Sequence, residues 1–348
     1  MTGTPPTSAE PGPPWRVIAS GLDNPRLLSF TAGGSLYVAE AGRGGDGPCI
    51  EGAEGLACFG RSGAITQIKG GNQRRLLKRL PSLAAEDGSG AIGPADVSVR
   101  RGRYAITVGL GNNPAVRAEL APTGGRLGTL LMGKIGRSAT VEANLATYEA
   151  RRNPDGGEPD SNPTGLLQTR HGYVVTDSGG NDLLGVGPNG RISTLAVFPD
   201  RLVPAPPFLP PGDIPMQAVP TSVVLGPDGA LYVSQLTGFP FPAGGSNIYR
   251  VVPGEEPTVF ASGLTNVTDL AWAGGHLYAV QLAGEGGLLA AEGLPVGSLV
   301  RIDSASTHTT VADELPAPYG VAIRGNDAYV TTCSVCAGSG EVVKISLN

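Results

Sequence analysis

The sequence predicts an all-β fold, a six-bladed β-propeller. Three observations support this fold class. A phrase of four short strands without a helix recurs along the 348 residues, turns rich in glycine and proline separate the strands, and the last copy lacks a strand that the beginning of the chain can supply. Apolar residues make up 40% of the chain, which is enough to fill a core despite 54 glycines and 31 prolines.

The clearest copy of the phrase covers residues 220–264. Its first two strands, 221–225 and 230–234, flank a Gly-Pro-Asp-Gly turn. Residues 248–252 and 258–261 supply the third and fourth strands, because both segments are short, apolar and bounded by turn residues. We take this copy as the pattern of one blade.

The other copies align at a residue that opens each first strand, a proline in all but the fifth copy. These opening positions are Pro25, Pro94, Pro163, Pro220, Val267 and Pro318. They are about 59 residues apart on average, which is typical of propeller blades with loop insertions. The second strands end in step with them, at Glu40, Val108, Asp177, Gln235, Gln281 and Thr332. Six openings predict six blades.

The outer strands predict how the ring closes. Only five fourth strands can be found, one of them poorly defined between Ser138 and Ala146, and the chain stops at a third strand, 341–348. Residues 15–22 resemble a fourth strand with no blade before it. We expect this N-terminal strand to complete the last blade and to remove an unpaired edge. Residues 15–348 would then form a single propeller, after a disordered leader at 1–14.

Insertions interrupt the blades mainly after second strands. These connections lie on the same end of a propeller as the segments that lead into the first strands, and we call this end the insertion face. Within one insertion, residues 142–152 are expected to form a short helix that Asn153-Pro154 stops. The insertions cover residues 42–62, 109–127, 133–160, 200–219 and 282–297.

Composition excludes two classes of partner. Charged residues are 16% of the chain and the net charge is -5, which provides no basic surface for nucleic acid or for an anionic membrane. No apolar run approaches the 18 or so residues of a membrane span. We expect a monomer that binds a small molecule or an extracellular protein.

The four cysteines fall into two local pairs. Cys49 and Cys58 bracket a glycine-rich loop, and Cys333 and Cys336 form a CxxC motif. Two local disulfides, and therefore secretion with removal of a signal peptide, are the prediction. The alternatives are a zinc site that uses all four thiolates and a redox-active CxxC, although the redox motif normally accompanies a βαβ unit.

Polar side chains gather at the insertion end of the predicted channel, in three sets. One set ends second strands, at Glu40, Asp177, Gln235 and Gln281. Another precedes the opening positions of blades one, three and five, at Asn24, Asn162 and Asn266. The third follows the opening positions of the opposed blades two and five, at Asp96 and Asp269.

A ring of carboxylates and amides suits a hard cation such as Ca²⁺, which takes six to eight oxygen ligands. The candidate metal ligands are Glu40, Asp96, Asp177 and Asp269. The alternative is that these residues stabilise turns or face solvent in the channel. A second oxygen-rich segment presents the same choice between calcium and an acidic turn, at Asp155, Glu158, Asp160 and Asn162.

Aromatic and basic groups on the insertion face can shape a pocket for an apolar or cyclic molecule. Phe239 and Phe241 are held by neighbouring prolines, so their rings either wall this pocket or pack over the blade edge. The full set of candidate ligand-binding residues is Asn24, Arg26, Asn162, Gln235, Phe239, Phe241, Asn266, Gln281 and Tyr319.

Several phrases resemble the ScyD/ScyE family, named from proteins encoded with scytonemin biosynthesis: AEAGRGGDGPC, TVGLG, NPDGGEPDSNPTGLL, DSGGNDLL, QAVPTSVV and QLTGFPFPAGGSNIYRV. The resemblance covers nearly the whole chain and implies a secreted propeller. The CxxC near the end departs from the serine-rich sequence of the family. A wider kinship with NHL, gluconolactonase and strictosidine-synthase propellers is an analogy of fold alone.

Three functions remain open. The first is a secreted binding propeller that holds a small ligand, a cation or a partner at the channel mouth. The second is a calcium-dependent lactonase or esterase in which Asp96 or Asp269 is the general base. The third, implied by the family resemblance, is a role in secondary-metabolite biosynthesis. A catalytic triad is not expected, because His171, His276 and His308 all lie in turns opposite the insertion face.

Overall fold

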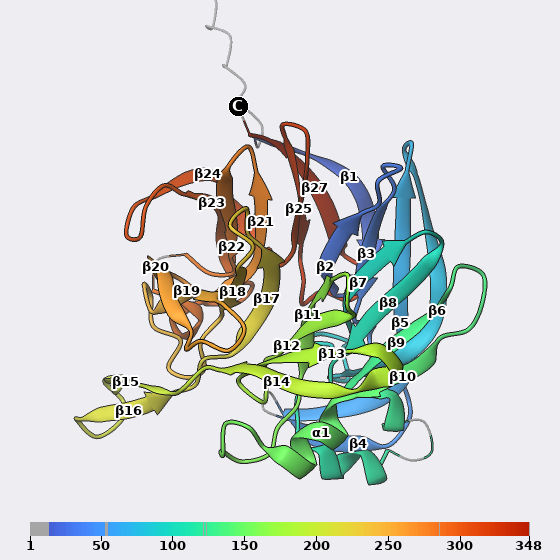
Figure 1. Ribbon diagram of the computed structural model, residues 1–348, viewed down its shortest axis with the longest axis horizontal. Coiled ribbons are helices and arrows are strands. Elements are labelled where there is room, and N and C mark those ends of the chain that lie inside the picture. The colour runs from blue at the N-terminus through green and yellow to red at the C-terminus, as the bar shows by residue number, and fades with distance from the viewer. Residues whose placement is uncertain (1–13, 53–54, 121, 123, 285, 348) are drawn as a thin grey trace, which may run out of the picture.

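A computed structural model describes residues 14–52, 55–120, 122, 124–284 and 286–347. In this part of the chain six antiparallel sheets surround a common axis, so the predicted six-bladed β-propeller is confirmed (Figure 1). The expected leader at 1–14 lies outside the described residues except for Pro14, and it stays a prediction.

The strands of the first three blades follow one another from the axis outward. Blade one contains β2 (Pro25–Phe30), β3 (Leu36–Glu40), β5 (Gly55–Lys69) and β6 (Asn72–Ala84), with β4 (Cys49–Gly52) beside the start of β5. Blade two contains β7 (Pro94–Arg100), β8 (Arg103–Val108), β9 (Thr129–Lys134) and β10 (Thr140–Asn144). Blade three contains β11 (Pro163–Gln168), β12 (Tyr173–Asp177), β13 (Asp182–Val186) and β14 (Ile192–Val197).

The last three blades repeat this order. Blade four contains β17 (Pro220–Leu225), β18 (Leu231–Gln235), β19 (Ser246–Val251) and β20 (Thr258–Leu264). Blade five contains β21 (Val267–Ala273), β22 (His276–Gln281), β23 (Val296–Ile302) and β24 (His308–Pro316). Blade six contains β25 (Val321–Arg324), β26 (Asp327–Thr332), β27 (Gly340–Ser346) and, as its outer strand, β1 (Trp15–Leu22).

The N-terminal strand closes the ring as predicted. β1 runs antiparallel to β27, with Trp15 opposite Ile345 and Val17 opposite Val343. This pairing satisfies the outer edge of β27, which would otherwise present free backbone groups. Closure also makes β2 and β25 neighbours, so the first strands of successive blades contact one another around the whole axis.

The core lies between neighbouring blades. Between blades one and two, for example, Ile65 and Leu80 pack with Tyr104 and Ile106, and all four side chains are buried. Alternation along each strand explains this arrangement, because apolar residues of successive sheets face each other. The blades are therefore layers of one structure and share their hydrophobic burial.

Hydroxyl groups near the axis add a hydrogen bond across every blade boundary. Each Ser or Thr side chain donates to a backbone carbonyl on, or just before, the first strand of the next blade, in the order Ser29 to Val97, Thr107 to Thr164, Ser178 to Pro220, Thr221 to Val267, Thr268 to Tyr319 and Thr331 to Arg26. Because the last bond returns to blade one, these six bonds form a closed ring that fixes the blades around the axis.

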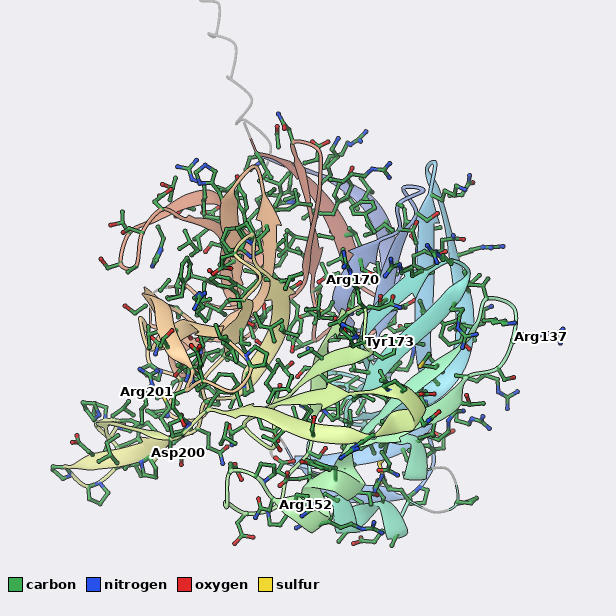
Figure 2. The ribbon with its side chains drawn as sticks, in the orientation of Figure 1. Arg137, Arg152, Arg170, Tyr173, Asp200 and Arg201 are labelled. Carbon is green, nitrogen blue, oxygen red and sulfur yellow. A yellow bond between two sulfur atoms is a disulfide. The ribbon has the colours of Figure 1, made fainter. Side chains whose placement is uncertain are left out.

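The insertions carry most of the remaining elements. Residues 109–127 include the 3-10 helices η1 (Pro114–Ala118) and η2 (Gly124–Arg126), and residues 282–297 include η4 (Leu288–Ala290). The single turn η3 (Pro188–Gly190) instead joins β13 to β14. Residues 200–219 form a projecting hairpin of β15 (Arg201–Pro204) and β16 (Asp213–Met216), which leaves the body at Asp200 and Arg201 (Figures 1 and 2).

The predicted helix at 142–152 begins later than expected, as α1 (Leu145–Arg152), because its first residues belong to β10. Asn144 caps α1 by accepting a hydrogen bond from the Thr147 amide. Asn153 ends it in the left-handed conformation, with φ of 40°. The predicted stop is therefore confirmed, and the helix is three residues shorter at its start.

Candidate active site in the axial channel

A cavity of about 550 Å³ occupies the central channel. The first strands of all six blades line it. It extends to the exposed residues Ala32 and Arg100, which lie at the far ends of these strands. The cavity therefore reaches the end of the propeller opposite the insertion face, whereas the sequence pattern predicted a ligand site on the insertion face.

Equivalent residues two positions after each opening residue form a layer around the axis, and four of these six residues line the cavity. The layer comprises Leu27, Asp96, Gly165, Ser222, Asp269 and Gly320. Asp96 and Asp269 belong to opposed blades and both line the cavity. They are 9% and 5% exposed, so a carboxyl pair faces the cavity with little access to bulk water.

Each carboxyl of this pair joins its own blade to the next one. Asp96 Oδ1 accepts from the Val97 amide at 2.6 Å, and Oδ2 accepts from the Leu166 amide of blade three at 2.8 Å. Asp269 Oδ1 accepts from the Leu270 amide at 2.8 Å, and Oδ2 accepts from the Val321 amide of blade six at 2.7 Å. The two halves of the propeller thus repeat the same contact.

One neighbour distinguishes the two carboxyls. The Ser222 hydroxyl of blade four donates to Asp269 Oδ1. Blade one has Leu27 at the position of Ser222, and a leucine cannot donate to Asp96. The hydrogen bond from Ser222 therefore stabilises the ionised form of Asp269, and Asp96 has no corresponding hydrogen bond.

Burial raises both pKa values into the neutral range. The pKa of Asp96 rises to about 8, mainly through burial and secondly through the negative charge of Asp269, against the amide bonds of Leu166 and Val97. The pKa of Asp269 rises to about 7 through burial, opposed first by the Ser222 hydroxyl. Near neutral pH the pair can therefore hold one proton, with the carboxyl at Asp269 the first to ionise.

The polar ends of the second strands do not join this pair. Glu40 Oε2 accepts from the Asp23 amide at 2.8 Å, and Asp177 Oδ1 accepts from the Asn162 amide at 2.5 Å. Gln281 Oε1 likewise accepts from the Thr265 amide at 2.7 Å, while Gln235 accepts from Asn247 at the start of β19. These side chains support backbone within their own blades, so the predicted single ring of ligands is not formed.

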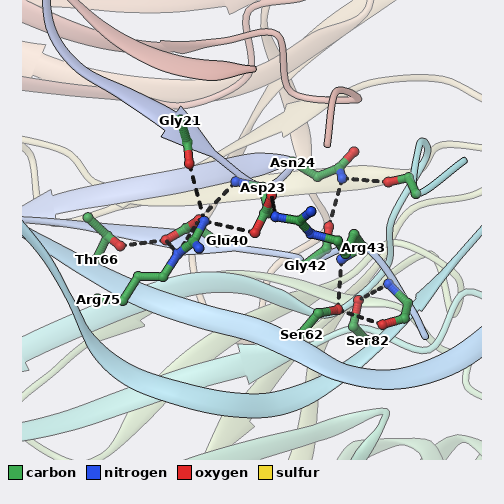
Figure 3. A network of polar contacts seen from close by, with 12 residues as sticks. Gly21, Asp23, Asn24, Glu40, Gly42, Arg43, Ser62, Thr66, Arg75 and Ser82 are labelled. Carbon is green, nitrogen blue, oxygen red and sulfur yellow. Dashed lines mark hydrogen bonds and ion pairs between the residues drawn. The ribbon is translucent and has the colours of Figure 1, made fainter. Parts of the chain in front are cut away.

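Glu40 lies in a separate ion-pair network (Figure 3). Arg75 Nη2 is 2.5 Å from Glu40 Oε2 and 2.8 Å from Asp23 Oδ2, and Arg43 contacts Asp23 at 2.7 Å. Thr66 donates to the other oxygen of Glu40. Glu40, a predicted metal ligand, is thus paired with a guanidinium. Arg75 was missed because it comes from an outer strand, and the sequence alone does not show which inner residue it contacts.

The asparagines before the opening positions connect loops of the insertion face. Asn24 Nδ2 donates to the carbonyls of Gly42 and Gly88, at 2.7 and 2.8 Å. Asn266 Nδ2 donates to Leu236 O at 3.0 Å, and its Oδ1 accepts from the Leu288 amide at 3.1 Å. Both residues have positive φ, which asparagine tolerates well, so they match the turn role that the sequence left open.

Arg26 and Tyr319 lie on the insertion side of the carboxyl pair. The guanidinium carbon of Arg26 is 4.8 Å from the centre of the Tyr319 ring, and Nη2 donates to Ala91 O at 2.7 Å. Arg26, on blade one, therefore links blade six to the segment before blade two, but neither Arg26 nor Tyr319 lines the axial cavity. Phe239 and Phe241 lie in the β18–β19 loop with their ring centres 6.4 Å apart, and they are not among the residues that line the axial cavity.

None of the three histidines lines the axial cavity. His171 borders another cavity, of about 400 Å³, with Arg170 and Tyr173 (Figure 2). His308 Nε2 contacts the Ser262 carbonyl at 2.8 Å. The sequence argument against a triad assumed a site on the insertion face; the cavity extends to the other end, but no histidine lines it.

The cysteines form the two predicted local disulfides, Cys49–Cys58 and Cys333–Cys336. The first joins β4 to β5, and the second lies in the loop after β26. Because all four sulfur atoms are paired, the alternative of a four-cysteine zinc site is excluded. Within the described residues, no helix has the length and apolar character needed to cross a membrane.

The axial pair does not fit a calcium ion. Calcium takes six to eight oxygen ligands, whereas the axis offers two carboxyls whose four oxygens already accept amide or hydroxyl hydrogens. In the part of the chain that the structure describes, no three Asp, Glu, His or Cys side chains are arranged as a ready metal centre. We therefore derive no chemical step through a metal in the channel.

No model of a known protein family matches the chain, and no curated protein matches it. Solved structures do match. A gluconolactonase of Xanthomonas campestris has a TM-score of 0.53 at 12% identity, covering 95% of this chain and 88% of that one. Virginiamycin B lyase of Staphylococcus aureus has a TM-score of 0.51 at 12% identity, with 95% and 99% covered. The calcium-binding protein regucalcin of Agrobacterium tumefaciens has a TM-score of 0.52 at 13% identity, with 95% and 92% covered.

At these identities the likeness shows the fold alone: the chain is similar to six-bladed propellers of the gluconolactonase and virginiamycin B lyase type. The resemblance to the ScyD/ScyE family remains a prediction.

Proposed function

We propose that the chain is a hydrolase of small cyclic esters or related esters, with the axial cavity as its active site. The observation that carries this proposal is the opposed carboxyl pair, Asp96 and Asp269, with pKa values of about 8 and about 7 in a cavity of about 550 Å³. Two carboxyl groups that share one proton at neutral pH can supply a general base and a general acid together. The gluconolactonase fold of similar structures supports the choice of substrate class by analogy.

Proton transfer by the pair accounts for ester hydrolysis. Ionised Asp269 accepts a proton from a water molecule as its oxygen bonds to the ester carbonyl carbon. Asp96, still protonated, donates its proton to the leaving alkoxide as the acyl carbon–oxygen bond breaks. The products are a carboxylic acid and a hydroxyl group, joined in one molecule when the substrate is a lactone. Release of the Asp269 proton to solvent and reprotonation of Asp96 restore the pair.

A second candidate is a secreted binding propeller, as a member of the ScyD/ScyE family would be. The observation that favours it is that every oxygen of the pair accepts a hydrogen bond from protein groups, which suits a role in holding blades together. The same cavity would then bind a small molecule without turnover. The two disulfides support export in either case.

Turnover measurements separate these candidates. We expect wild-type protein to hydrolyse members of a panel of lactones and aryl esters, and Asp96→Asn and Asp269→Asn each to lower kcat/KM by about 10²- to 10⁴-fold. Asp313→Asn, an exposed carboxylate on β24, is the matched control and should retain activity. Thermal denaturation of each variant checks that it is folded.

Ser222→Ala keeps both carboxyls and tests their roles. Loss of the hydroxyl should raise the pKa of Asp269 and move the acidic limb of the pH profile of kcat/KM to higher pH. Activity that survives in folded Asp96→Asn and Asp269→Asn would remove the pair from catalysis. Binding of panel compounds without any turnover would select the binding propeller.

A further inference from the structure

Five carboxyl groups converge beside blade three, away from the channel axis. Glu149 belongs to α1, Asp155 and Asp160 to the segment that follows it, and Asp177 and Asp182 to the facing ends of β12 and β13. We call these residues the α1–blade three cluster. Asp177, a predicted axial ligand, lies here instead. Figure 1 shows α1 next to the sheet of β13 and β14.

Two members of the cluster are buried with free oxygens. Asp182 is 1% exposed and neither of its oxygens has a hydrogen-bond partner in the described part of the chain. Glu149 is 2% exposed and its Oε1 also has none. The buried oxygens Asp160 Oδ1 and Asn153 Oδ1 are unpaired in the same way. Buried polar atoms are normally satisfied, so these unpaired acceptors favour a bound donor or cation.

No basic side chain in the described part of the chain neutralises these carboxyls. Among the described residues, none of the five carboxyls forms an ion pair with Lys, Arg or His. Arg151 and Arg152, the nearest basic residues in sequence, end α1 with exposed side chains. A buried acidic group without a compensating charge is costly.

The electrostatics agree with this geometry. Burial raises the pKa of Glu149 to about 7, with further upward contributions from Asp177, Asp155 and Asp160. Burial, and then Asp177, Glu149 and Asp155, raise the pKa of Asp182 well above its usual value. The carboxyls are thus close enough to repel one another, and a bound cation would allow all of them to ionise.

Two glycines let acidic side chains of the cluster approach the backbone closely. A Cβ atom on Gly179 would lie 2.8 Å from Asp160 Oδ1, and one on Gly180 would lie 3.1 Å from Glu149 Oε2. Both acidic side chains therefore face the same glycine pair between β12 and β13. Asp177 is held by Ser161 Oγ at 2.7 Å, and Asp155 by the Gly157 amide at 2.9 Å, so two carboxyls are anchored by hydrogen bonds, whereas both oxygens of Asp182 lack a partner among the described residues.

We propose that Glu149, Asp160 and Asp182, with Asn153 Oδ1 and the anchored Asp155, form a calcium site that fastens α1 and its following loop to blade three. Oxygen-only donors of mixed carboxylate and amide type suit Ca²⁺, which accepts six to eight such ligands in flexible geometry. Magnesium fits less well, because it demands near-ideal octahedral geometry and retains most of its water. The oxygens are not yet gathered as a metal centre among the described residues, and the ion would draw the free side chains together around the glycine pair.

Calcium binding to the full-length protein tests the proposal without any activity assay. After treatment with chelator and dialysis, calorimetric titration with CaCl₂ should show one bound equivalent, and CaCl₂ should raise Tm. Asp182→Asn should weaken calcium binding by more than about tenfold and remove the effect of CaCl₂ on Tm. Because the amide of this variant carries no charge, the variant should be at least as stable as wild type without calcium. If chelation unfolds wild type, recovery of the folded circular dichroism signal with CaCl₂ is the equivalent expected result.

Asp213→Asn, an exposed carboxylate on β16, is the matched control and should bind calcium as wild type does. Absence of calcium binding by wild type would overturn the proposal. Unchanged binding by both Asp182→Asn and Glu149→Gln would put the ion elsewhere. Equal affinity for MgCl₂ would overturn the choice of calcium. None of these outcomes depends on Asp96 or Asp269, so the site and the proposed hydrolase function can fail separately.

Discussion

Single side chains decide the chemistry of the axial pair. Asp96 and Asp269 occupy equivalent places and make equivalent amide contacts, yet one has Ser222 beside it and the other has Leu27 in the corresponding position. The hydroxyl stabilises ionised Asp269, so that the lower pKa belongs to that residue. An asymmetric pair of this kind divides the roles of base and acid without needing a third titratable group.

The same pair should make stability depend on pH. The pKa of Asp96 is about 8 in the folded chain against an ordinary value of 3.8. Between these values the folded state binds more protons than the unfolded state, so the free energy of unfolding falls as pH rises and levels off above the folded pKa. We expect wild-type Tm to fall between about pH 5 and about pH 8.5, and Asp96→Asn to fall by less, in calorimetric melts.

The raised pKa values of the α1–blade three cluster also make stability fall as pH rises. The melts are therefore done with saturating CaCl₂, and Asp96→Asn is compared with wild type. Asp303→Asn is the control, because its exposed carboxyl has a lowered pKa and titrates below this window. If Tm fell equally steeply with pH in wild type and in Asp96→Asn, Asp96 would be ionised throughout this pH range, and its pKa would not be raised.

Residue roles were predicted less well than residue positions. The sequence identified Asp96 and Asp269 as an opposed pair because both follow an opening position by two residues. It did not identify Ser222, since one serine at that position in a β-strand carries no signal until its neighbour in space is known. Glu149 and Asp182 were missed because a helix and a strand end bring them together, whereas the recognised acidic segment contained only their partners Asp155 and Asp160.

At the scale of elements, glycines permit the first strands to approach one another. Gly165 and Gly320 take the places in blades three and six that Asp96 and Asp269 take in blades two and five. A Cβ on Gly165 would lie 2.7 Å from Ser222 Cα, and one on Gly320 would lie 2.7 Å from Arg26 O. Their absent side chains let the following amides reach the two carboxyls.

Gly320→Ala should therefore separate blades six and one. We expect a loss of roughly 1–3 kcal/mol in the free energy of unfolding, as for other overpacked sites, measured by urea denaturation. Gly33→Ala is the matched control, because a Cβ there meets nothing within 4 Å and its φ is not positive. A loss no greater than that of the control would show that the first strands can move apart at little cost.

The sequence predicted the right element wherever the local residue pattern agreed with the packing of the folded chain. The blade strands alternate and are bounded by turns, so they were recognised. The β15–β16 hairpin was taken only as an insertion because Pro204 and Pro215, among other prolines, argue against strands. Since this hairpin pairs only with itself, its free edges tolerate proline. The early start predicted for α1 reflects a helical propensity that pairing of β10 with β9 overrides.

At the scale of the whole molecule, the count of strands was enough to predict a closed ring, but not which end of the channel is open. Closure depends on a missing fourth strand, which is visible in the sequence. The position of the cavity depends on side-chain packing between blades that the sequence pattern does not reveal. Insertions on one face suggested a site there, whereas the cavity extends along the first strands toward Ala32 and Arg100 at the opposite end.

Ring closure by β1 should be essential to the soluble folded state. A chain that begins after Leu22 would leave the outer edge of β27 unpaired and would expose Val342 and Val343, which are buried against neighbouring strands. Because an exposed strand edge favours pairing with other chains, we expect this truncation to lower Tm strongly and to form aggregates in size-exclusion chromatography. A chain that begins at Pro14 retains β1 and should elute and melt as the full-length protein does. If both truncations behaved alike, closure by β1 would contribute nothing measurable, and the remaining strands would have to hold the ring through contacts between the first strands alone.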